Sequence, residues 1–288
     1  MKIALGTAQF GLNYGVANTK GRLALDEGER IIALARRYGM HTLDTAIAYG
    51  ESELSLGKIG INDWKVVTKL PAIPDHCVDV TAWVRSEVKG SLRRLGVGRL
   101  YALLLHRPSQ LFDHHGPQLF SSMQRLVAEG VVQKIGVSIY DPSELGPLFE
   151  RWDFDLVQAP FNVLDRRLLK SGWASWLKDR GVELHARSVF LQGLLLMPAV
   201  SRPVWFRQWE SLWILWDRWL NECGLSPVHA CLRTALAVPE TDQIVLGVDS
   251  EVHLREALEA ANGPPPPWDK APQTDDLTLL NPANWTLP

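Results

Sequence analysis

Four residues of complementary chemistry stand at or near the ends of short apolar segments. Asp44, Lys69 and His106 each end such a segment, and Tyr49 follows Asp44 by five residues. A tyrosine has a reference pKa near ~10, and a buried ammonium beside it stabilises the phenolate and lowers that pKa. An aspartate beside the lysine holds the ammonium charged, and a neutral histidine can orient a carbonyl oxygen. Together the four side chains predict a general acid that protonates a developing alkoxide.

Each of these residues taken alone has a simpler interpretation. Asp44 is compatible with a turn or a helix cap, and Lys69 with an exposed loop lysine. His106 is compatible with a hydrogen-bonded core histidine, and Tyr49 with plain packing. The catalytic interpretation depends on the four being brought together, which requires a particular arrangement of strands.

Parallel strands whose carboxyl ends converge would bring the four side chains together. Eight short apolar segments alternate with amphipathic segments along the chain, and they are 3–5, 41–44, 65–69, 100–106, 135–138, 156–160, 182–187 and 243–247. Eight strand–helix units predict an α/β fold, a (β/α)8 TIM barrel of one domain. A doubly wound sheet is the alternative, but no GxGxxG follows the first apolar segment.

Helix boundaries are indicated by residues with capping chemistry. Asp26 with Glu29 suggests a capping box at the start of the first helix, and Gly96 suggests the end of a later one. Asp141 before a proline, and Ser226 before another, each suggest the start of a helix.

Two features in the last third of the chain lie outside this regular alternation. Four tryptophans recur at helical spacing before the last strand, and they are Trp205, Trp209, Trp213 and Trp216. We expect them to pack in the core; a wall beside the substrate or a subunit contact is the alternative. We divide the chain into a barrel over residues 1–262 and a Pro-rich C-terminal tail, 263–288, packed on the barrel.

Composition narrows the classes of function. The 288 residues carry 30 Lys and Arg against 32 Asp and Glu, a net charge of −2, which argues against a nucleic-acid partner. Three scattered cysteines without a CxxC pair argue against a zinc ribbon or a disulfide framework. We see neither a signal peptide nor a membrane span, and we expect a cytoplasmic protein. The sequence does not indicate an oligomeric state.

Seven segments of the chain, in order, resemble the landmark segments of the aldo-keto reductases. They are LGTAQFG, DTAIAYGESELSLGK, VVTKL, LLLHRP, GVVQKIGVS, QAPFNVLDR and IVLGVDSEVHLREAL, and the resemblance covers about residues 2–260. It implies a (β/α)8 barrel that reduces the carbonyl group of a small molecule with a nicotinamide cofactor. Carried over by matching motif, Tyr49 would be the general acid and Lys69 would modulate its pKa. Asp44 would pair with Lys69, and His106 would orient the carbonyl.

The resemblance also implies a cofactor surface, and it implies no metal. Gly6, Thr7 and Ala8 match a turn beside the nicotinamide, and Ser138 and Gln158 match positions that bind its carboxamide. The family often has Ser-Asn at the first of these positions, whereas Ile139 follows Ser138 here. Further implied contacts are Asp44, Arg187, Ser188, Phe190, Gly193, Gly247, Asp249, Ser250, Leu254 and Glu256. Arg187 stands where a tyrosine often stacks on the nicotinamide, and a guanidinium plane can stack as well.

The choice of nicotinamide cofactor rests on the segment after the eighth strand. Residues 247–253 contain no Lys or Arg, and Asp249 and Glu251 add negative charge that favours NAD(H). Ser250 and the amides of the next helix could hold an anion, and Arg255 could reach round. Members of the family usually prefer NADP(H). We therefore expect NADP(H) first, with NAD(H) or dual use open.

Two other classes of function are compatible with a barrel. A metal-dependent hydrolase commonly needs a His-x-His pair on the first strand, and residues 3–5 have none. A non-catalytic nicotinamide-binding module that senses redox state would not need Tyr49 together with Lys69. The carbonyl reductase is therefore the favoured hypothesis.

Overall fold

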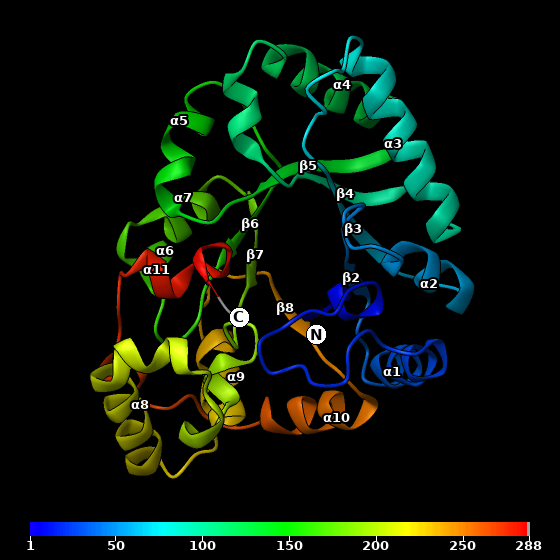
Figure 1. Cartoon of the computed structure of the whole chain (residues 1–288). Coiled ribbons are helices and arrows are strands. Elements are labelled where there is room, and N and C mark those ends of the chain that lie inside the picture. The colour runs from blue at the N-terminus through cyan, green and yellow to red at the C-terminus, as the bar shows by residue number, and fades with distance from the viewer. Residues whose placement is uncertain (287–288) are drawn as a thin grey trace.

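A closed barrel of eight parallel strands forms the centre of the computed structural model, which describes residues 1–286 (Figure 1). The strands follow one another in sequence order, and they are β1 (Ile3–Gly6), β2 (Thr42–Asp44), β3 (Lys65–Leu70), β4 (Leu100–Leu105), β5 (Val132–Ser138), β6 (Leu156–Pro160), β7 (Glu183–Arg187) and β8 (Gln243–Gly247). The register places Gly6 beside both Asp44 and Gly247, so the carboxyl ends of β1, β2 and β8 lie level. The predicted barrel is confirmed.

Strand β5 begins earlier than the apolar pattern suggests. Val132 already pairs with Leu100 of β4, although Gln133 is exposed and Lys134 half-buried. The first residues of β5 include polar side chains, so a pattern based on apolar residues alone does not detect the start of the strand.

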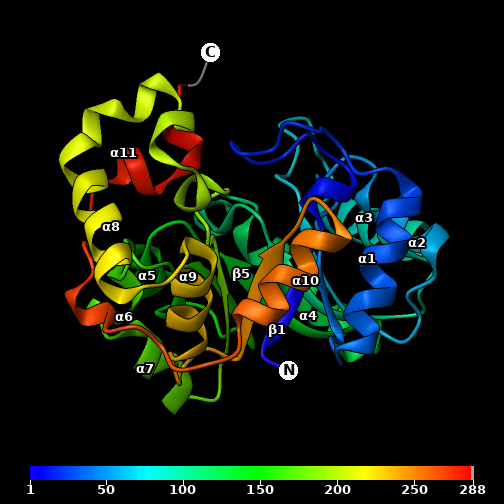
Figure 2. The ribbon, with the colours of Figure 1, turned by 90° about the horizontal axis from the view of Figure 1, so that it is seen from below.

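Helices form a ring around the strands (Figure 1), and Figure 2 shows the same ribbon from below, with α1, α9 and α10 beside the strands. They are α1 (Leu25–Arg37), α2 (Ser52–Ile59), α3 (Val80–Leu95), α4 (Gly116–Ala128), α5 (Leu145–Phe149), α6 (Arg167–Lys170), α7 (Trp173–Asp179), α8 (Glu210–Cys223), α9 (Pro227–Leu236), α10 (Glu251–Ala260) and α11 (Leu277–Leu280). Gly96 ends α3 in the left-handed conformation, as predicted. The capping box at Asp26 is wrong: the helix begins two residues earlier, after Ala24, and Asp26 pairs with Arg30.

The tail and the Trp-rich segment pack together on one side of the barrel. Trp213 and Trp216 are buried in the core, as expected, whereas Trp205 and Trp209 are only partly buried. Trp285 of the tail packs edge-on against Phe206. Arg166 donates a hydrogen bond to the carbonyl of Ala271 at 2.9 Å, which ties the tail to the segment before α6. Residues 287–288 of the expected tail lie outside the described part. No helix within residues 1–286 is long and apolar enough to cross a membrane.

Candidate active site

A buried ion pair lies at the carboxyl ends of β2 and β3. Lys69 Nζ donates to both carboxylate oxygens of Asp44, at 2.8 and 2.9 Å, and to the carbonyl of Thr45 at 2.9 Å. Lys69 is 1% exposed and Asp44 is 4% exposed. Burial lowers the pKa of Lys69, and the Asp44 carboxylate opposes that shift. The predicted pairing of these two residues is present.

Ser138 and Gln158 extend this pair into a hydrogen-bonded chain. Gln158 Nε2 donates to Asp44 Oδ1 at 2.6 Å, and Ser138 Oγ donates to Gln158 Oε1 at 3.2 Å. Both side chains are buried and turned toward Asp44, and neither lines the cavity described below. Gln158, itself bonded to Ser138, thus holds the Asp44 carboxylate that pairs with Lys69, and the contact of both residues with a carboxamide stays a prediction.

A tight turn between β2 and α2 carries Tyr49. The amide of Tyr49 bonds to Ala46 and its carbonyl accepts from Ser52, each at 3.0 Å. Ser52 Oγ also donates to the carbonyl of Thr7 at 2.8 Å, which fastens the turn to the end of β1. A Cβ atom on Gly11 would lie 1.8 Å from the carbonyl oxygen of Tyr49, so only glycine allows this close approach. The Ser of the Tyr-Gly-x-Ser motif therefore positions the turn.

The ring of Tyr49 lies between the other members of the set. Its centroid is 5.9 Å from that of His106, edge to face, and Lys69 Nζ lies over the ring at 5.2 Å from the centroid. Burial raises the pKa of Tyr49 and Asp44 adds to the shift, whereas Arg187 opposes it. The predicted lowering of the Tyr49 pKa by Lys69 is therefore not found, because burial is the largest effect on this group and Asp44 adds to it.

His106 is neutral over the physiological range. Burial, followed by the positive charges of Lys69 and Arg187, lowers the pKa of His106 to about 4. A neutral imidazole can donate one N–H hydrogen bond without carrying charge. This is the state that the sequence analysis required.

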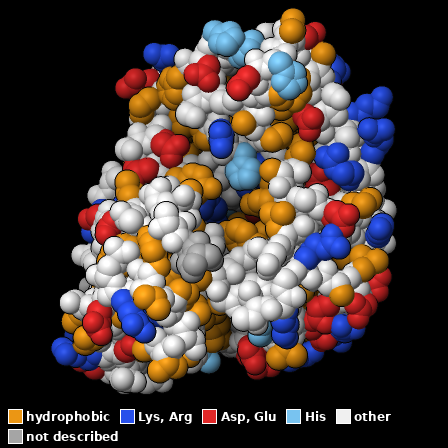
Figure 3. Space-filling view, in the orientation of Figure 1, with side chains coloured by type: hydrophobic (Ala, Val, Ile, Leu, Met, Phe, Trp, Pro, Cys, Tyr) orange, Lys and Arg blue, Asp and Glu red, His pale blue; other side chains and the backbone are white. Residues whose placement is uncertain are grey.

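A cavity of about 470 Å³ opens at the carboxyl face of the barrel, where Figure 3 shows a hollow with apolar, histidine and basic side chains around it. It runs from Asp44 and Tyr49 at the barrel axis to α10. The implied residues that line it are Gly6, Thr7, Ala8, Asp44, Arg187, Ser188, Phe190, Gly193, Gly247, Asp249 and Glu256. Besides Ser138 and Gln158, two implied contacts do not line it: Leu254 is buried in the core, and Ser250 caps α10 by accepting from the amide of His253.

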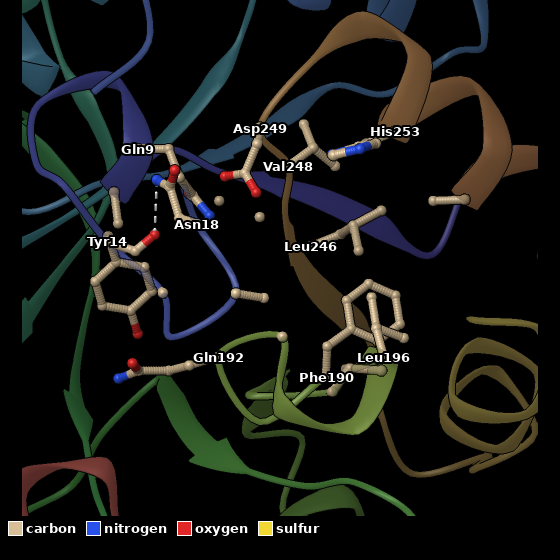
Figure 4. Close-up of a pocket in the computed structure, with 18 of the residues that line it drawn as sticks. Gln9, Tyr14, Asn18, Phe190, Gln192, Leu196, Leu246, Val248, Asp249 and His253 are labelled. Carbon is tan, nitrogen blue, oxygen red and sulfur yellow. Dashed lines mark hydrogen bonds between the residues drawn. The ribbon is translucent and has the colours of Figure 1, made fainter. Parts of the chain in front are cut away.

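Several lining residues were not foreseen, and they come from two loops that meet across the cavity. Figure 4 shows Gln9, Tyr14 and Asn18 facing Gln192. The amide of Val16 donates to the carbonyl of Gln192 at 3.1 Å, which joins the loop after β1 to the loop after β7. Asn18 Nδ2 donates to the carbonyl of Tyr14 at 3.1 Å. Burial and the nearby Tyr49 raise the pKa of Tyr14 to about 12.

The loop after β7 is strained where it borders the cavity. Ser188, Leu191 and Gln192 have positive φ angles of 63°, 48° and 54°. Such conformations of residues other than glycine gather at ligand sites, where surrounding contacts impose them. Gly193 has φ of 89°, and a Cβ atom there would lie 2.7 Å from Ala17 Cβ, so the two loops touch.

Arg187 brings a positive charge to the axial end of the cavity. Its guanidinium lies over the ring of Tyr140 at 4.4 Å from the centroid, and Nη2 donates to the carbonyl of Ile139 at 2.8 Å. Nη1 donates to Ser188 Oγ at 3.1 Å. The side chain is thus fixed beside Tyr49, inside the cavity and not on the outer surface.

A closed parallel barrel with polar side chains at the carboxyl ends of its strands is the arrangement of barrel enzymes. The model of the aldo/keto reductase family matches residues 2–269, so the chain belongs to this family and is an oxidoreductase. Members of the family use nicotinamide cofactors and small carbonyl substrates.

Curated relatives and solved structures resemble the chain over most of its length. It is 30% identical to the 6-dehydroglucose reductase of Agrobacterium fabrum over 251 residues, 77% of this chain and 78% of that one. It is 24% identical to the uncharacterized oxidoreductase YqkF of Bacillus subtilis, covering 87% and 85% of the two chains. The holo form of the aldo-keto reductase AKR11C1 of Bacillus halodurans superposes with a TM-score of 0.74 at 20% identity, over 92% and 87%. The glycerol dehydrogenase AKR11B4 of Gluconobacter oxydans gives 0.70 at 23%, over 93% and 88%.

Proposed function

We propose that this protein reduces an aldehyde or ketone of a small metabolite or sugar to the alcohol, with Tyr49 as the proton donor. The observation that carries the proposal is the convergence of the four residues: Tyr49 and Asp44 line the axial end of one elongated cavity, and His106 and Lys69 contact them from beside it. The name of the Agrobacterium fabrum relative supports a sugar carbonyl as the first class to test.

The cavity suits a nicotinamide dinucleotide in shape and chemistry. Gly6 and Gly247 leave backbone exposed along one wall, where any Cβ would crowd Val245 or Gln9. A buried oxygen of Asp249 without a hydrogen-bond partner in the described chain faces the far end and needs a donor. When bound, the reduced nicotinamide supplies the hydride. Arg187 would lie against the ring, as the resemblance implies.

Each residue of the axial end has a task in the reduction. His106, neutral at physiological pH, donates a hydrogen bond that orients the carbonyl oxygen. As hydride adds to the carbonyl carbon, that oxygen becomes an alkoxide and takes the phenolic proton of Tyr49. The raised pKa of Tyr49 keeps its proton in place until the far more basic alkoxide forms. The Lys69–Asp44 pair packs against the Tyr49 ring and holds it in place.

The test is turnover of reduced cofactor, followed by absorbance, across a panel of aldehydes, ketones and aldoses. We expect Tyr49→Phe to lower the turnover rate by about 10²–10⁴-fold. Its affinity for the cofactor should stay within a few-fold of the wild-type value. Tyr14→Phe is the matched control, because it removes the same atom from the same cavity outside the catalytic set, and it should stay within a few-fold of wild type. Tight cofactor binding without turnover of any substrate would refute the proposal and favour a nicotinamide-binding module.

A further inference from the structure

Asp249, two residues after the end of β8, presents to the cavity a carboxylate with one unsatisfied oxygen. Its Oδ1 atom is buried and has no hydrogen-bond partner within residues 1–286. Figure 4 shows the Asp249 side chain directed into the cavity, with Gln9 on one side of it and His253 on the other. Buried polar atoms are nearly always hydrogen-bonded, so an unpaired acceptor in a ligand cavity indicates a donor on the ligand.

The position of Asp249 in the cavity identifies the part of the ligand that it meets. Hydride transfer requires the nicotinamide at the axial end, beside Tyr49. The opposite end, at β8 and α10, then holds the adenosine half and its ribose. Asp249 and Glu256 line this end.

The groups at the start of α10 that could hold a ribose phosphate are already engaged. The amide of Glu251 donates to Glu27 Oε1 at 2.5 Å, and the amide of His253 donates to Ser250 Oγ at 3.2 Å. A helix N-terminus can bind a phosphate through such amides, but here a carboxylate from α1 occupies the place. Glu27 therefore adds a negative charge where a phosphate would need a positive one.

Two nearby cations, Arg255 and Arg30, are also paired with carboxylates. Arg255 Nη2 donates to Glu251 Oε1 at 2.6 Å on the exposed side of α10, and Arg30 pairs with Glu27. Of the described residues that line the cavity, Arg187 is the one Lys or Arg, and it lies at the axial end. Lys20 is the cation whose charge acts on Asp249, together with His253, but Lys20 is exposed and does not line the cavity.

We infer that Asp249 selects the cofactor: its carboxylate accepts a hydrogen bond from the 2′-hydroxyl of the adenosine ribose and repels a 2′-phosphate. The inference rests on the proposed function. In Rossmann folds an acidic residue on the ribose 2′-hydroxyl selects NAD(H) over NADP(H), and the same hydrogen bond and charge repulsion would act in a barrel. From the sequence we expected NADP(H) as the preferred cofactor. Because Ser250, Arg255 and the α10 amides are already engaged, we now infer that NAD(H) is preferred.

The test measures Kd for NADH and for NADPH at fixed salt, by quenching of the intrinsic fluorescence of the 12 tryptophans in the full chain. We expect wild type to bind NADH at least tenfold more tightly, about 1.4 kcal/mol. Asp249→Asn keeps the shape and removes the charge, so the ratio should fall at least tenfold, mainly through tighter NADPH binding.

Glu259→Gln is the matched control, because it changes the net charge equally on the same helix at an exposed position outside the cavity lining. Its ratio should equal that of wild type. Tighter binding of NADPH by wild type would overturn the inference and leave the proposed function intact, and this measurement needs no variant. An equal change in both variants would also overturn it, since the effect would then be long-range. Binding of neither dinucleotide would refute the proposed function and the inference with it.

Discussion

Replacing Lys69 by methionine should destabilise the fold by about 3–5 kcal/mol, the usual cost of removing one partner of a buried ion pair. The substitution deletes the three hydrogen bonds that Nζ makes to Asp44 and to Thr45. The Asp44 carboxylate remains buried with Gln158 as its side-chain donor. With a urea m-value of roughly 3 kcal/mol/M for a chain of this size, the unfolding midpoint should drop by roughly 1–2 M.

Two further variants make this test specific. Lys170→Met breaks an exposed pair with Asp275, in which the lysine side chain is 43% exposed, so it should cost less than about 1 kcal/mol. Adding Asp44→Asn to Lys69→Met removes the stranded charge and should recover part of the lost stability. A midpoint for Lys69→Met equal to that of Lys170→Met would refute the reasoning, because the Asp44 carboxylate would then not depend on Lys69.

Two other predictions concern the surroundings of Tyr49. His106 binds a proton only near pH 4 when folded but near pH ~6.5 when unfolded. The unfolded state then holds more protons between these values, so stability should fall as the pH drops through this window, and His106→Gln should flatten the urea midpoint measured at pH 5 and 7. Gly11→Ala places a Cβ against the Tyr49 carbonyl and should displace the phenol, with a loss of roughly 10² in rate for a shift near 1 Å. Gly98→Ala, with open space around it, should have wild-type kinetics, and equal rates in both variants would contradict the role of the turn.

The barrel and the convergence of Asp44, Lys69 and His106 could be predicted from the sequence because each residue lies at the end of an apolar strand or next to it. Parallel strands in sequence order leave one face on which their carboxyl ends can meet. The far wall of the cavity could not be predicted in this way. It depends on the contact between the amide of Val16 and the carbonyl of Gln192, two loop positions far apart in sequence whose backbone atoms carry no pattern.

The hydrogen-bond partners of the polar side chains were the second feature that could not be predicted from the sequence. Gln158 and Ser138 were correctly placed at the ends of neighbouring strands, yet the amide turns to Asp44 and leaves the cavity. A sequence gives the donors and acceptors at a site, but the partner that each one takes depends on positions resolved to a fraction of an ångström. The same limit applies to Arg255, which pairs with Glu251 instead of reaching the cofactor end.

The two ends of the cavity differ in charge, and this difference links the proposed chemistry to the inferred cofactor choice. At the axial end Lys69 and Asp44 cancel and His106 is neutral, so Arg187 leaves a net positive charge beside Tyr49. A fixed positive charge stabilises the negative oxygen that develops during hydride addition. At the α10 end Asp249 and Glu256 line the cavity and Glu27 lies behind it, so an added phosphate there would meet like charge. The reacting end therefore favours a forming anion, whereas the ribose end favours a neutral hydroxyl.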